Sequence, residues 1–97
     1  MAKTAQETIK DLERARKNAV ELRNTSTSDV TRLNQQAQEL RDSIKSSSTP
    51  DGQKRQDRTT LIIVTGDLRT AQRDVQSQTI LIRRIDAEIA KVKRNSK

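Results

Sequence analysis

Two sets of apolar residues that recur every three or four positions, one set on each side of a single turn signal, constrain the fold of this chain most strongly. The second half carries the clearer repeat. Its members are Leu61, Val64, Leu68, Ala71, Val75, Gln78, Ile82, Ile85, Ile89 and Val92. All but Gln78 are apolar, and alternating spacings of three and four are typical of the contact stripe, or seam, of a coiled-coil helix. The repeat therefore predicts a long helix over about 50–94.

The first half carries the same repeat with more polar members. They are Ala2, Ala5, Ile9, Leu12, Arg16, Ala19, Arg23, Ser26, Val30, Leu33, Ala37, Leu40 and Ile44. The spacing does not slip across the polar positions, which favours one helical register from end to end. A second long helix is predicted over about 3–46.

The segment between the two repeats has the composition of a turn. Ser, Thr, Pro, Asp and Gly cluster over residues 46–52 and nowhere else so densely. Thr49 is predicted as the N-cap of the second helix, with Pro50 as its first residue and Asp51 in its first turn. The expected fold is all-α, a long antiparallel helical hairpin that forms a single domain over 1–97 and ends in a basic tail, 91–97.

The two repeats predict a specific pairing of residues across the hairpin. If the chain folds back at the turn, residues whose numbers add to 101 face one another, as Leu33 faces Leu68 and Ala37 faces Val64. In three of the layers an Ala lies opposite a β-branched residue, which keeps layer volume roughly even. The predicted seam consists of Ile9, Leu12, Ala19, Val30, Leu33, Ala37, Leu40, Leu61, Val64, Leu68, Ala71, Ile82, Ile85, Ile89 and Val92.

Two segments leave alternatives open. Residues 24–29 are polar and poor in helix formers, and Ser26 with Asp29 resembles a capping box. The first arm is therefore either one continuous helix or two helices that break near residues 24–28, which would give three helices in all. Residues 59–65 form a β-branched run before Gly66 that is also typical of a buried strand. The uninterrupted repeat favours helix there.

The composition lacks many of the residue types that catalytic sites commonly use. The chain has no His, Cys, Phe, Tyr or Trp, and its two glycines form no phosphate-binding loop. The pair Glu7 and Asp11 lies among Lys3, Lys10 and Arg14, as is typical of a solvated, ion-paired helix surface. We expect no enzyme activity, no cofactor and no metal site.

Charge favours partners with negative surfaces. The net charge is +7, from 20 Lys and Arg against 13 Asp and Glu. Two basic clusters are the candidate phosphate contacts: Lys54, Arg55 and Arg58 after the turn, and Lys91, Lys93, Arg94 and Lys97 in the tail. Solubilising charge explains the same residues without any nucleic acid.

Four large aliphatic residues lie outside the seam of the second helix: Ile62, Ile63, Ile80 and Leu81. A free two-helix hairpin would expose them to water. Such a surplus predicts a second buried surface, used either for self-association or for docking onto another protein.

These observations favour a non-catalytic structural or assembly protein, a helical subunit or adaptor in a larger complex such as a virion or a secretion apparatus. Two alternatives stay open: a small basic protein that contacts nucleic-acid phosphates without sequence preference, and a helical chaperone or regulator of a partner protein. No signal peptide and no transmembrane segment is predicted, so we expect synthesis in the cytoplasm.

Overall fold

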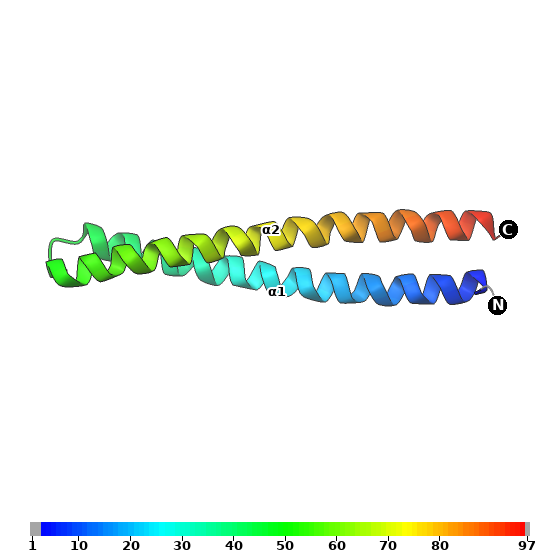
Figure 1. The fold of residues 1–97 in the computed structure, drawn as a ribbon, viewed down its shortest axis with the longest axis horizontal. Coiled ribbons are helices and arrows are strands. Elements are labelled where there is room, and N and C mark those ends of the chain that lie inside the picture. The colour runs from blue at the N-terminus through cyan, green and yellow to red at the C-terminus, as the bar shows by residue number, and fades with distance from the viewer. Residues whose placement is uncertain (1–2, 97) are drawn as a thin grey trace. The chain divides into compact units, whose positions relative to one another are not determined.

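The computed structural model describes residues 3–96 and contains two long helices (Figure 1). Helix α1 runs over Ala5–Lys45 and helix α2 over Asp51–Asn95. All regular secondary structure within the described residues is helical, which confirms the all-α prediction, and the two long helices agree with the predicted hairpin.

Thr4 caps the start of helix α1, which the sequence analysis did not predict. The Thr4 Oγ1 atom accepts a hydrogen bond from the Glu7 backbone N–H at 3.1 Å and donates one to the Glu7 carboxylate at 3.2 Å. The Thr4 carbonyl accepts the first helical bond, from the Thr8 N–H. The Thr4 side chain thus satisfies one of the backbone N–H groups that a helix start leaves without a partner.

The turn between the helices occupies residues 46–50. The Thr49 N–H donates to the Ser46 carbonyl, and the Ser46 and Ser48 hydroxyls bond to each other at 2.8 Å. The Pro50 carbonyl accepts from the Lys54 N–H, so Pro50 caps α2 and Asp51 is its first residue. The predicted cap, Thr49, is therefore one position too early, an error within the usual uncertainty of helix ends.

Helix α1 is continuous through residues 24–28, so the three-helix alternative is not found. The seam repeat does not slip across this segment, and threonine hydroxyls here bond back to the helix backbone. Thr25 donates its hydroxyl to the Glu21 carbonyl and Thr31 to the Thr27 carbonyl, each four residues back. Such bonds satisfy short polar side chains inside a helix. Thr59 and Thr60 bond in the same way in the segment that also resembled a strand.

Contacts divide the described chain into two units, each an antiparallel pair of helix segments. We call residues 26–73 the turn unit and residues 3–25 with 74–96 the terminal unit. The turn unit has a contiguous apolar core. Its buried members are Leu33, Ala37, Val64, Leu68 and Ala71, and Val30, Leu40 and Leu61 pack against them.

The terminal unit buries fewer apolar side chains. Ala19, Ile82 and Ile85 are buried, whereas Ile9, Leu12, Ile89 and Val92 are half-buried. The start of α1 and the end of α2 lie side by side in this unit (Figure 1). Its contact stripe therefore contains fewer buried apolar side chains than that of the turn unit.

Candidate interaction surfaces

Every residue of the predicted seam is either buried or half-buried in the structure. The polar members of the repeat differ among themselves. Arg16 is exposed, while Arg23, Ser26 and Gln78 are half-buried. The seam is thus an internal surface, and the residues free to meet a partner lie outside it.

Two hydrogen bonds between the helices show the register within each unit. In the turn unit the Ser43 hydroxyl donates to the Asp57 carboxylate at 2.5 Å, and the two residue numbers add to 100. In the terminal unit the Arg16 Nε donates to the Asp86 carboxylate at 2.6 Å, and those numbers add to 102. Both bonds lie within one residue of the predicted sum of 101.

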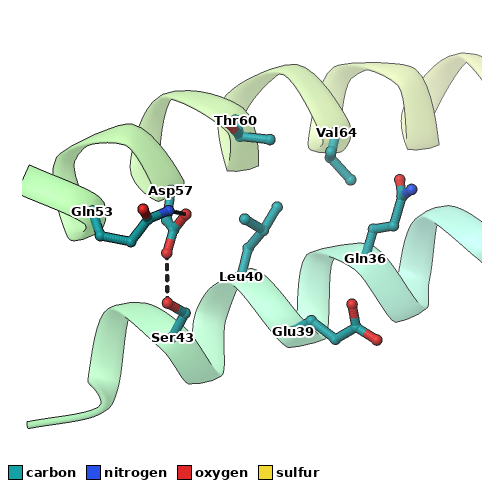
Figure 2. A pocket seen from close by; sticks show the side chains of 8 residues that line it. All are labelled: Gln36, Glu39, Leu40, Ser43, Gln53, Asp57, Thr60 and Val64. Atoms are coloured by element: carbon teal, nitrogen blue, oxygen red, sulfur yellow. Dashed lines mark hydrogen bonds between the residues drawn. The ribbon is translucent and has the colours of Figure 1, made fainter. Parts of the chain in front are cut away.

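A groove beside the turn lies between the two helix segments of the turn unit (Figure 2). Both helices contribute to its lining, with Leu40 and Val64 as its apolar members. Asp57 lies in it between two donors: Ser43 bonds to one carboxylate oxygen and the Gln53 Nε2 bonds to the other at 2.8 Å. Asp57 is the buried charged residue of the described chain, at 8% exposure.

The arrangement around Asp57 holds the helix ends together beside the turn. A buried carboxylate needs hydrogen-bond donors, and here each of its two oxygens has one. Sequence reasoning missed this residue, although a signal was present. Asp57 lies seven positions before Val64 and so extends the seam repeat by one heptad, with a polar member.

Five large aliphatic residues outside the predicted seam are exposed, some in each unit. In the turn unit Ile62 is 74% exposed and Ile63 is 60% exposed. Ile62 also lines a shallow hollow with Leu61, Thr65, Gly66 and Arg69. An added Cβ at Gly66 would meet nothing within 4 Å, so this hollow is open.

The terminal unit has its own exposed aliphatic residues. Ile80 is 49% exposed and Leu81 is 43% exposed. Leu22, at 56% exposure, lies at the level of Ile80 and Leu81 in the register of this unit and borders a second shallow hollow. All four predicted partner-interface residues are therefore exposed to solvent.

The predicted phosphate contacts are distributed over both units. In the turn unit Arg55 and Arg58 are exposed and Lys54 is half-buried. In the terminal unit Lys91, Lys93 and Arg94 are exposed, whereas Lys97 lies outside the described residues. None of the six described side chains forms an ion pair within residues 3–96. Their charges remain available to an external anion.

The described residues offer no cluster that could bind a metal ion. Within residues 3–96, no group of three or more acidic side chains has the required arrangement. Over the same residues, neither α1 nor α2 combines the length and apolarity that a bilayer crossing requires.

Comparisons with known proteins assign no family to the chain. No protein-family model, no curated protein and no solved structure matches it.

Proposed function

We propose that this chain is a non-catalytic helical subunit or adaptor that docks into a larger protein assembly, such as a virion or a secretion apparatus. The observation that supports the proposal is the exposure of large aliphatic side chains outside the seam. Ile62, Ile63 and Leu22 are each more than half exposed. Fully burying one such side chain stabilises by about 1.5–3 kcal/mol, so a partner that covers them gains several kcal/mol.

The weakness of the internal contacts supports the same proposal. Two helices that meet along one stripe bury little of their surface, and small domains have little stability to spare. In the terminal unit the stripe also includes polar members such as Arg23 and Gln78. A second contact surface would supply the burial that a single seam lacks, as when hairpins associate into helical bundles.

The test replaces one exposed aliphatic residue in each unit by lysine. The double variant Ile63→Lys, Leu81→Lys should lose association in sedimentation experiments at micromolar to millimolar concentrations, with its helical circular dichroism retained. Gln56→Lys combined with Ser77→Lys is the matched control, because it adds two lysines at exposed polar positions of the same helix. The control should associate like the parent.

The proposal fails if the parent is already a stable, folded monomer at micromolar concentration and the double variant equals it in stability and activity. It also fails if the control loses association to the same extent. In that case added charge, rather than loss of the aliphatic surface, would explain the effect.

A further inference from the structure

The outer face of α2 in the terminal unit has charges of one sign only. The outer face consists of the exposed positions that point away from the seam. Its charged members are Arg83, Arg84, Lys91 and Arg94, and all four are exposed. Its remaining members are Gln76, Ser77, Ile80, Ala87 and Ala90, which are also exposed. No acidic residue interrupts this face over residues 74–96.

The nearest acidic residues lie on the flanks of the seam. Asp86 is held by the Arg16 Nε across the helix pair at 2.6 Å, so its charge is already compensated. Glu88 is exposed on the opposite flank of α2, between Arg84 and Lys91 in the sequence. Asp74, 14 residues before Glu88 on the same flank, is exposed as well, so two free carboxylates border a face with four unpaired cations.

The outer face of α1 in the same unit provides an internal comparison. It also carries four cations: Lys3, Lys10, Arg14 and Lys17. Three acids are interspersed among them, Glu7, Asp11 and Glu21, and Lys3 forms an ion pair with Asp11. The two faces have equal numbers of basic residues, but the three acids leave the α1 face with a net charge of +1, against +4 for the α2 face.

We propose that this face of α2 binds the phosphate backbone of a nucleic-acid duplex without reading its sequence. Arg83 and Arg94 are separated by 11 residues, which is about 16 Å along a helix. A duplex carries one negative charge per ~1.7 Å of its axis, so a linear row of cations meets phosphates along its whole length. Three of the four residues are arginines, whose planar guanidinium groups bind phosphate through two hydrogen bonds.

Other polyanions fit this face less well. Anchoring in an anionic bilayer requires several large apolar side chains among the cations, whereas Ala87 and Ala90 lie between Arg84 and Arg94 and Ile80 is the one large apolar side chain on the described part of this face. Binding of single strands relies on aromatic side chains that stack on bases, and the chain contains none. The backbone of a duplex requires neither feature.

The experiment measures binding of the full chain to a 20-base-pair DNA duplex as a function of salt concentration. Four phosphate contacts give a log–log slope of about −3.6, so affinity should fall ~150-fold between 50 and 200 mM salt. The variant Arg83→Gln, Arg84→Gln, Lys91→Gln, Arg94→Gln should lose most of this affinity and of the slope. The matched control, Lys3→Gln, Lys10→Gln, Arg14→Gln, Lys17→Gln, removes the same charge and should keep the slope.

Further measurements separate this proposal from its competitors. Arg84→Gln alone should reduce the magnitude of the slope by about 0.9, and unchanged circular dichroism would show that the fold is retained. Phosphatidylserine vesicles and polyglutamate at the same salt should bind weakly and equally to the parent and the α2 variant. The proposal is overturned if the parent does not bind the duplex at 50 mM salt, or if both quadruple variants lose affinity equally. Vesicle or polyglutamate binding that depends on the same four residues more strongly than duplex binding would also overturn it.

Discussion

The two units of this hairpin differ in whether a buried polar residue of the seam has hydrogen-bond partners. In the turn unit Asp57 is buried, but Ser43 and Gln53 each donate a hydrogen bond to it. In the terminal unit the Gln78 Oε1 atom is buried and has no hydrogen-bond partner among the described residues. The first arrangement specifies how the helices meet beside the turn, whereas the second leaves an amide oxygen desolvated without compensation.

The turn unit also buries more of its apolar seam side chains than the terminal unit does. The turn unit has a contiguous core around Leu33 and Leu68, while the terminal unit buries Ala19, Ile82 and Ile85 and leaves its other apolar members half-buried. Because stability follows buried apolar area, we infer that the terminal unit opens at lower free energy than the turn unit.

The largest effect is expected from truncation in the core of the turn unit. Leu33→Ala removes a side chain that is 6% exposed, and buried Leu→Ala changes destabilise by about 2–5 kcal/mol. Leu12→Ala makes the same chemical change at a half-buried position of the terminal unit and should cost less than half as much. Urea unfolding followed by circular dichroism measures both. Equal losses would contradict the inferred difference between the units.

The second prediction concerns the satisfied polar site. Ser43→Ala leaves one Asp57 oxygen without its donor, and a lost hydrogen bond to a charged group costs about 1.5–3 kcal/mol. Asp57→Leu removes the need for both donors and should cost less than Ser43→Ala, because an apolar side chain suits this seam position. Thermal unfolding of the two variants gives the order. Ser47→Ala, at an exposed position in the turn, is the control and should change the midpoint little.

These residues show which features of the structure the sequence could predict and which it could not. The three-four repeat and the turn composition predicted two helices and their joint, because burial imposes a period on apolar residues. A repeat specifies positions but not hydrogen-bond partners, so the Asp57 contacts and the Thr4 cap were missed. Continuity through residues 24–28 was also undecided, because the local preferences of short polar residues opposed the unbroken repeat. The exposed aliphatic residues were expected, since their positions lie outside the repeat.

The third prediction concerns the unsatisfied polar site of the terminal unit. Gln78→Leu replaces a desolvated amide oxygen with apolar atoms, and an unsatisfied buried group costs about 1–3 kcal/mol. We therefore expect stabilisation by about 1–2 kcal/mol, with slower amide hydrogen exchange over the terminal unit. Gln76→Leu, two positions away and exposed, is the control and should leave exchange unchanged. A Gln78→Leu protein less stable than its parent would show that this polar layer contributes to folding.

The smallest effect is expected at the start of α1, where Lys3 pairs with Asp11. The hydrogen bond and charge of Lys3 lower the pKa of Asp11 below its ordinary value of 3.8. A carboxyl with a lowered folded-state pKa stabilises the fold above its unfolded pKa, and this contribution is lost as pH falls through the folded pKa. The window therefore lies below about pH 4, and salt should weaken the effect because both groups are exposed. In an NMR titration, Lys3→Gln should raise the Asp11 pKa toward 3.8, whereas Lys10→Gln should not, because Lys10 makes no comparable contact with Asp11. If Lys3→Gln leaves the Asp11 pKa unchanged, the contact at the start of α1 is not formed as described. The terminal unit would then be even less stable relative to the turn unit.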